Sequence, residues 1–112
     1  VVEEMSIIGE VEGKNIIIID DMVDTAGTLV LAAEMMKERG AKSIRAFATH
    51  PILSGNAIER INNSPLEELV VTDSVPMRSS SPKIKVLSIA DIFAKTIEAV
   101  TLNRSISINF VF

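Results

Sequence analysis

Two adjacent aspartates, Asp20 and Asp21, and a short polar run that follows them are the residues of this sequence best suited to chemistry. The aspartates offer carboxylate oxygens, which bind vicinal hydroxyl groups or a hydrated magnesium ion. The run consists of Asp24, Thr25, Ala26, Gly27 and Thr28. Its small side chains, hydroxyl groups and backbone N–H groups suit a phosphate, and Gly27 lets the backbone approach a ligand closely. A hydroxyl or metal end followed by a phosphate end describes a site for a phosphorylated sugar.

The elements on either side of this loop explain how it is positioned. Residues 16–19 are four consecutive isoleucines, a pattern typical of an inner parallel strand buried on both faces. A helical pattern of apolar residues follows the loop and is predicted to end at Gly40. The loop therefore lies at the carboxyl end of a strand and the amino end of a helix, where α/β sheets bind anionic ligands. Acidic residues before a helix also stabilise its positive end without any ligand, so the aspartate pair alone leaves both interpretations open.

The rest of the chain continues the alternation of strands and helices. Further strands are predicted over residues 1–8, 43–49, 67–72 and 84–87, with helices after residues 54 and 88. The fold class is therefore α/β, with a parallel-centred sheet flanked by helices. The tail from Ser105 to Phe112 alternates polar and apolar residues, and we expect it to pack on its own domain or across a subunit interface.

His50 is the one histidine of the chain and stands before Pro51 at the end of a predicted strand. Histidine titrates near neutral pH, which invites a role as acid or base. A single histidine at such a corner is more often a hydrogen-bonded structural residue, and we favour that interpretation. Its place at a strand end still puts it close to the predicted site.

The stretch from Ile16 to Thr28 closely resembles the ribose-5-phosphate loop of the type I phosphoribosyltransferase fold, in which two acids and a D-T-x-G-T loop follow a hydrophobic strand. Residues 49–55 (THPILSG), residues 59–63 (ERINN) and the tail resemble the ribose-phosphate pyrophosphokinases, or PRPP synthetases. The resemblance runs over nearly the whole chain. It implies the carboxyl-terminal portion of such an enzyme, a partial phosphoribosyltransferase-like domain over residues 1–112.

The resemblance also implies a reaction and a role for each loop residue. In this family the C1 hydroxyl of ribose 5-phosphate attacks the β-phosphorus of Mg-ATP, which releases AMP and forms phosphoribosyl diphosphate. Asp20 and Asp21 would hold the ribose hydroxyls, and the run from Asp24 to Thr28 would cradle the 5-phosphate. A carboxylate beside a phosphate is repulsive, so we expect Asp24 to accept backbone N–H bonds that shape the loop, or to reach the phosphate through water or metal.

Other expectations follow from the family. Mg²⁺ is the implied cofactor with ATP as co-substrate, and a cytoplasmic homo-oligomer is the implied state. The family's basic catalytic loop, metal-binding histidine and ATP contacts would all precede Val1, so we assign no catalytic or metal-binding residue to this chain. We expect a fragment that binds sugar phosphate weakly and turns nothing over.

Two alternatives remain. A phosphoribosyltransferase that acts on a nucleobase would share the loop, but it is not expected to carry residues 49–55 or the serine-rich tail. A non-catalytic regulatory relative would keep the fold and lose the loop chemistry, whereas all three loop acids and Gly27 are present here.

Composition narrows the remaining classes of protein. The chain has 112 residues, 47% of them hydrophobic, which suits one compact domain. The net charge of −4 and the scattered basic residues argue against a nucleic-acid surface. No apolar run reaches the roughly 20 residues of a membrane-spanning helix. The absence of cysteine excludes disulfides and is compatible with a reducing compartment.

Overall fold

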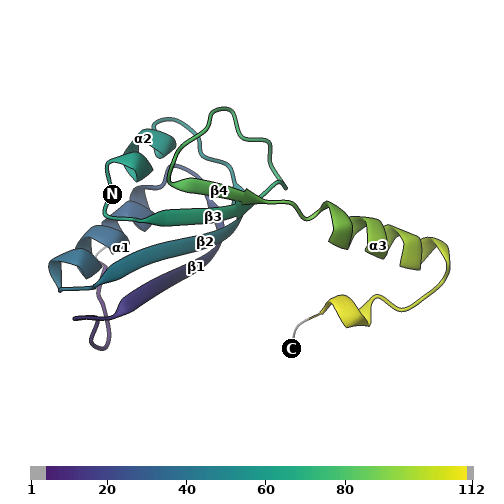
Figure 1. Cartoon of the computed structure of the whole chain (residues 1–112), viewed down its shortest axis with the longest axis horizontal. Coiled ribbons are helices and arrows are strands. Elements are labelled where there is room, and N and C mark those ends of the chain that lie inside the picture. Colours follow the sequence, from purple (N-terminus) through teal and green to yellow (C-terminus); the bar gives the residue numbers. More distant parts are fainter. Residues whose placement is uncertain (1–4, 111–112) are drawn as a thin grey trace.

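A four-stranded parallel sheet forms the body of the protein in the computed structural model, which describes residues 5–110 (Figure 1). The strands lie across the sheet in chain order and are β1 (Asn15–Val23), β2 (Ser43–Pro51), β3 (Glu68–Thr72) and β4 (Ile84–Leu87). Helix α1 (Gly27–Glu38) connects β1 to β2, and α2 (Ala57–Asn62) connects β2 to β3. Helix α3 (Ala90–Thr101) and a short 3₁₀ turn (Ser107–Asn109) follow β4. The predicted α/β class with a parallel sheet is confirmed.

The core lies between one face of the sheet and the two helices α1 and α2. Alternate residues of β2 point into it, and Ile44 is fully buried there. Helix α1 contributes Leu29 and Ala33, and α2 contributes Ile61. Helix α1 ends as predicted before Gly40, whose φ of 92° is left-handed and which donates its N–H to the carbonyl of Lys37 at 3.0 Å.

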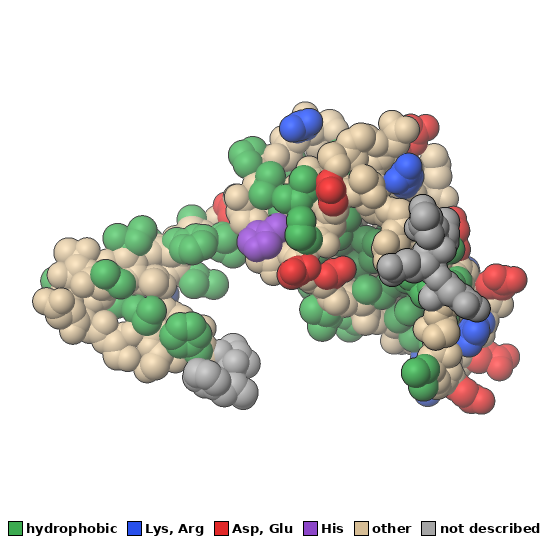
Figure 2. Space-filling view, turned by 180° about the vertical axis from the view of Figure 1, so that it is seen from behind, with side chains coloured by type: hydrophobic (Ala, Val, Ile, Leu, Met, Phe, Trp, Pro, Cys, Tyr) green, Lys and Arg blue, Asp and Glu red, His purple; other side chains and the backbone are tan. Residues whose placement is uncertain are grey.

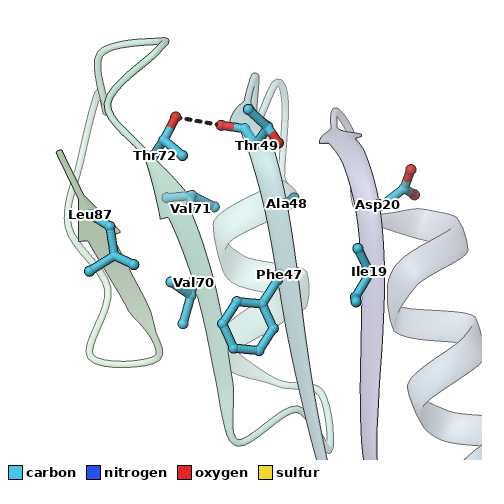
Figure 3. A pocket seen from close by; sticks show the side chains of 9 residues that line it. All are labelled: Ile19, Asp20, Phe47, Ala48, Thr49, Val70, Val71, Thr72 and Leu87. Carbon is cyan, nitrogen blue, oxygen red and sulfur yellow. Dashed lines mark hydrogen bonds between the residues drawn. The ribbon is translucent and has the colours of Figure 1, made fainter. Parts of the chain in front are cut away.

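The prediction that β1 is an inner strand buried on both faces is wrong for the described residues. β1 pairs with β2 and lies at the edge of the sheet. Ile17 and Ile19 are 61% and 80% exposed, whereas Ile16 and Ile18 are half-buried against the core. The reason is that α1 and α2 cover one face of the sheet. Figure 3 shows the open face, where Ile19 and Phe47 help to line a shallow hollow of about 210 Å³.

Helix α3 projects from the body instead of packing on the sheet (Figures 1 and 2). No residue of α3 is buried, and its apolar stripe is more than half exposed. The stripe consists of Ile92, Phe93, Ile97 and Val100. Asp73, after β3, fixes the approach to α3, because its carboxylate accepts the N–H of Ile89 at 2.9 Å and the hydroxyl of Ser88 at 2.7 Å.

The two ends of the chain compare differently with expectation. In the predicted tail segment, Asn109 folds back and donates from Nδ2 to Oγ1 of Thr96 at 3.0 Å, while residues 111–112 lie outside the described residues. The strand predicted over residues 1–8 is not seen where it can be judged. Residues 5–8 form no strand, and residues 1–4 lie outside the described part.

Candidate functional site

The loop between β1 and α1 lines a hollow of about 270 Å³. Every residue of the predicted site except Asp21 lines it. The lining residues are Asp20, Met22, Val23, Asp24, Thr25, Ala26, Gly27, Thr28 and Leu29. Asp20 borders the hollow, whereas its neighbour Asp21 lies outside the lining. The structure thus gathers Asp20 and the run from Asp24 to Thr28 around one space, with Asp21 just outside its lining.

The two aspartates are held close to their own strand. Oδ1 of Asp20 accepts the N–H of Asp21 at 2.8 Å, and Oδ1 of Asp21 accepts the N–H of Met22 at 2.8 Å. The pKa of Asp21 lies below its ordinary value because of a hydrogen bond with the side chain of Asp20, the bond from Met22 and the nearby charge of His50. Both carboxylates are exposed, so they remain accessible to a ligand.

Helix α1 begins without any capping side chain. Ala26 is its N-cap residue, and no side chain among residues 5–110 bonds to the first-turn N–H groups. The first helical hydrogen bond runs from the N–H of Val30 to the carbonyl of Ala26 at 2.9 Å, and the first turn contains no acidic residue. The amides of Gly27, Thr28 and Leu29 are therefore left without a partner in the described residues, at the positive end of the helix. Such an arrangement attracts an anion.

The backbone turns from strand to helix at Ala26, not at Gly27. Ala26 has φ 64° and ψ 7°, which is left-handed and costs an alanine about 1 to 2 kcal/mol. A Cβ added to Gly27 would lie 3.7 Å from Nη1 of Arg60 and 3.8 Å from Oγ1 of Thr25, which is ordinary contact. Gly27 is therefore not required by the fold of the chain itself, and its predicted role rests on the space it leaves for a ligand.

Asp24 helps to hold the loop in place, by a contact that the sequence analysis did not foresee. Its Oδ1 accepts the hydroxyl of Ser54, and its backbone carbonyl accepts the N–H of Ser54 at 3.1 Å. Within the described residues, the partner of this carboxylate is thus a hydroxyl and not the backbone N–H that we expected. Asp24 is a shaping residue of the loop all the same.

Arg60 is the second loop contact that sequence reasoning missed. Its Nη1 donates to the carbonyl of Thr25 at 3.0 Å, from the side of α2. Arg60 lies within the ERINN segment, so the resemblance drew attention to it without indicating a role. No local signal connects Arg60 to Thr25, because the two residues are 35 positions apart and only the docking of α2 brings them together.

His50 occupies the same end of the sheet, paired across the strands with Met22. It is exposed, and its Nδ1 lies 2.8 Å from the hydroxyl oxygen of Ser74. This contact fits a corner residue held by a hydrogen bond. Residues 5–110 contain no group of three or more His, Cys, Asp or Glu side chains that could hold a metal ion, and no helix among them is long and apolar enough to cross a membrane.

Comparison with known proteins decides the family. The profile of the phosphoribosyl synthetase-associated domain matches residues 2–111. The chain belongs to this family. Ribose-phosphate pyrophosphokinase of Helicobacter hepaticus is 55% identical over 105 residues, which are 94% of this chain and 34% of that protein. The enzyme of the same name from Campylobacter jejuni is 51% identical over 109 residues, 97% of this chain and 35% of that protein.

The fold of this phosphoribosyl synthetase-associated domain matches a solved structure. The crystal structure of phosphoribosylpyrophosphate synthetase from Mycobacterium smegmatis superposes with a TM-score of 0.84 at 41% identity. The match covers 86% of this chain and 33% of that chain. The chain thus spans about a third of the length of the relatives that it matches.

Proposed function

We propose that this chain carries the ribose 5-phosphate site of a ribose-phosphate diphosphokinase. The observation that supports this most directly is the hollow between β1 and α1, which combines an exposed carboxylate with an uncapped helix amino terminus. The 5-phosphate would lie against the amides of Thr25 to Thr28, and Asp20 would accept hydrogen bonds from ribose hydroxyls. Asp21, whose side chain is hydrogen-bonded to that of Asp20, would supply a second carboxylate beside the ribose. Relatives named for this activity, at about half identity, support the same assignment.

In the proposed reaction a P–O bond forms between the C1 oxygen of ribose 5-phosphate and the β-phosphorus of ATP. The bond from that phosphorus to the oxygen that bridges it to the α-phosphorus breaks, and AMP leaves. The residues described here bind and orient the sugar, so that its C1 hydroxyl is presented in one position. Stabilising the charge on the migrating group takes cationic groups. The described residues gather no lysine at the hollow, and their Arg60 bonds to the loop backbone.

Magnesium fits the donor set of this site. Mg²⁺ keeps several waters and is usually held by one or two carboxylates together with substrate phosphates, and the exposed carboxylates of Asp20 and Asp21 supply such oxygens. When bound, the ion would neutralise phosphate charge. We also propose that residues 1–112 form one part of a phosphoribosyltransferase-like domain, and that the complete enzyme is a cytoplasmic homo-oligomer.

Amide chemical shifts test this function directly. Ribose 5-phosphate titrated into the ¹⁵N-labelled chain is expected to shift the amides of Thr25 to Thr28. Ribose without phosphate should fail to do so, because the anion site would stay empty. Replacing ribose 5-phosphate by its 2-deoxy analogue should weaken binding about tenfold through the loss of one hydrogen bond to a carboxylate.

A coupled assay for AMP release completes the test. With ATP, magnesium and ribose 5-phosphate, we expect no turnover by the 112-residue chain, since the loss of one good electrostatic contact to the transition state costs about a hundredfold in rate and several would be missing. In the amide titration, chemical-shift changes confined to residues outside the loop would refute the proposed site. Turnover at the rate of an ordinary enzyme would show that the catalytic groups lie within this chain.

A further inference from the structure

The segment from Leu53 to Arg60 grips one side of the binding loop. Three successive backbone carbonyls of the loop accept hydrogen bonds from it. The carbonyl of Val23 accepts the N–H of Leu53 at 3.0 Å, that of Asp24 accepts the N–H of Ser54 at 3.1 Å, and that of Thr25 accepts Nη1 of Arg60 at 3.0 Å. The first two bonds come from the backbone. The third comes from a side chain and is the one that a substitution can remove.

These bonds decide where the amides of the loop point. All peptide bonds in the described chain are trans, so each N–H points away from the carbonyl of its own peptide group. With the carbonyl of Thr25 held toward Arg60, the N–H of Ala26 points to the opposite side of the loop. That side is the 270 Å³ hollow, whose lining contains no residue of the Leu53 to Arg60 segment. The residues around Arg60 line a separate hollow with Val30 and Asn56.

The bond from Arg60 also acts on the most strained residue of the loop. The peptide that it holds, Thr25–Ala26, immediately precedes the left-handed φ of Ala26. Alanine keeps such a conformation only where its surroundings impose it. On the other side, the carbonyl of Ala26 is held by the N–H of Val30 at 2.9 Å. Arg60 and the first turn of α1 thus fix the two peptide groups that flank Ala26.

We propose that Arg60 is a positioning residue for the phosphate end of the site: by bonding to the carbonyl of Thr25 it holds Ala26 left-handed and turns the N–H of Ala26 toward the ligand. This inference rests on the proposed function, because it assigns a purpose to an orientation within that site. Arg60 acts through the backbone of the loop. Its guanidinium faces a carbonyl and is not offered to the phosphate.

The central experiment removes the bond with Arg60→Met, which keeps an unbranched side chain, and compares it with Arg39→Met. Arg39 is a matched control because it also donates to a backbone carbonyl, that of Ile7 at 3.4 Å, at the far end of α1. The first readout is the three-bond coupling between the N–H and Hα of Ala26 in the ligand-free chain, which reports φ. We expect Arg60→Met to move this coupling away from its wild-type value and Arg39→Met to leave it unchanged.

The second readout is affinity for ribose 5-phosphate. Arg60→Met should weaken binding about tenfold, the usual effect of losing a hydrogen bond from a charged donor, and Arg60→Lys should restore most of it. Adding Ala26→Gly to Arg60→Met should recover at least half of the loss on a logarithmic scale, because glycine adopts the left-handed conformation without penalty. Direct phosphate binding by Arg60 predicts otherwise. The loss would then disappear at about 1 M salt, where exposed charges are screened, and glycine would not reverse it.

The two proposals fail in different ways. If ribose 5-phosphate shifts no loop amide in the wild-type chain, the proposed function fails, while the coupling of Ala26 in the unliganded variants still tests the positioning role. If binding occurs but Arg60→Met leaves both the coupling and the affinity unchanged, the positioning role is wrong. Circular dichroism of each variant shows whether the fold is kept. If Arg60→Met unfolds the chain, Arg60→Gln, whose shorter polar side chain carries no charged donor, takes its place with and without Ala26→Gly.

Discussion

At the scale of the residue, the site depends on a contrast between Ala26 and Gly27. The position that needs an unusual φ holds alanine, which restricts the unfolded chain more than glycine and so commits the loop to fewer conformations. The position with ordinary φ holds glycine, where a Cβ would touch only Arg60 and Thr25 at van der Waals distance. Ala26 thus restricts the backbone of the loop, and Gly27 beside it leaves space for a ligand.

Gly27→Val is expected to separate binding from folding. A Cβ here makes ordinary contacts with Nη1 of Arg60 at 3.7 Å and Oγ1 of Thr25 at 3.8 Å, so the fold should be kept, while the two methyl groups of valine occupy the space predicted for the phosphate. We expect affinity for ribose 5-phosphate to fall at least about tenfold, the equivalent of one lost charged hydrogen bond. Calorimetric titration measures the change, and Glu38→Val, at an exposed position at the far end of α1, is a control for the general effects of a valine in this helix. Unchanged affinity would show that the phosphate does not lie against the amides of Gly27 and Thr28.

Much of the residue-scale site could be predicted from the sequence, because it is local. Asp20 and the run from Asp24 to Thr28 are neighbours along the chain, so any strand-loop-helix arrangement brings them together. The contacts that shape the loop could not be predicted. Ser54 and Arg60 come from the next loop and helix, and their distance to Asp24 and Thr25 depends on how α2 docks against α1.

At the scale of the element, Asp73 controls how α3 leaves the sheet. The N–H of Ile89, together with the hydroxyl of Ser88, holds the pKa of Asp73 below its ordinary value. A lowered pKa in the folded chain means that this anchorage is present above the pKa of the unfolded state and is lost as the pH falls through the folded value. The anchored start of α3 is therefore a feature of neutral and weakly acidic solution.

Carbon-detected titration of the Asp73 carboxylate tests this. We expect it to titrate at lower pH than aspartate in an unfolded peptide, and Ser88→Ala should raise its pKa by removing one of the two donors. The amide of Ile89 should shift with the same midpoint, since it bonds to the same group. Ser79→Ala, an exposed serine of the preceding loop, should leave both curves in place. Titration at the peptide value would show that the contact is not populated in solution.

The elements themselves were predicted better than their burial. Periodicity located β1, α1 and β2 because strand and helix patterns depend on near neighbours. The prediction was wrong about the burial of residues 16–19. Four isoleucines in a row indicate a strand buried on both faces, whereas the described residues bury only one face of β1. Whether a strand is central or at an edge is set by what pairs beside it, which local sequence does not encode.

At the scale of the molecule, the open face of the sheet and the stripe of α3 leave much apolar surface in contact with water. Ile19 and Phe47 on the sheet, and Phe93 and Ile97 on α3, are each at least 40% exposed. Figure 2 shows apolar side chains on α3 and on the body that it leaves. Exposed apolar surface of this kind favours association.

We expect the 112-residue chain to self-associate through this surface. Burying a phenylalanine or isoleucine side chain contributes about 1.5 to 3 kcal/mol, so Phe93→Gln with Ile97→Gln should weaken association at least about tenfold. Lys95→Gln, which lies between them on α3, is the matched control because it keeps the apolar stripe and the helix propensity. Sedimentation equilibrium measures the dissociation constants. A double variant that associates as strongly as the control would place the contact away from α3.

The order of the strands across the sheet affects the order in which parts of the chain can fold. Each strand pairs with the next one along the chain, so every pairing closes a short loop and assembly proceeds from neighbour to neighbour. Within the described residues, the hydrogen bonds that the segment after β2 makes to the binding loop come from residues that precede the end of α2. The residues that make these contacts therefore all leave the ribosome before β3, β4 and α3 do.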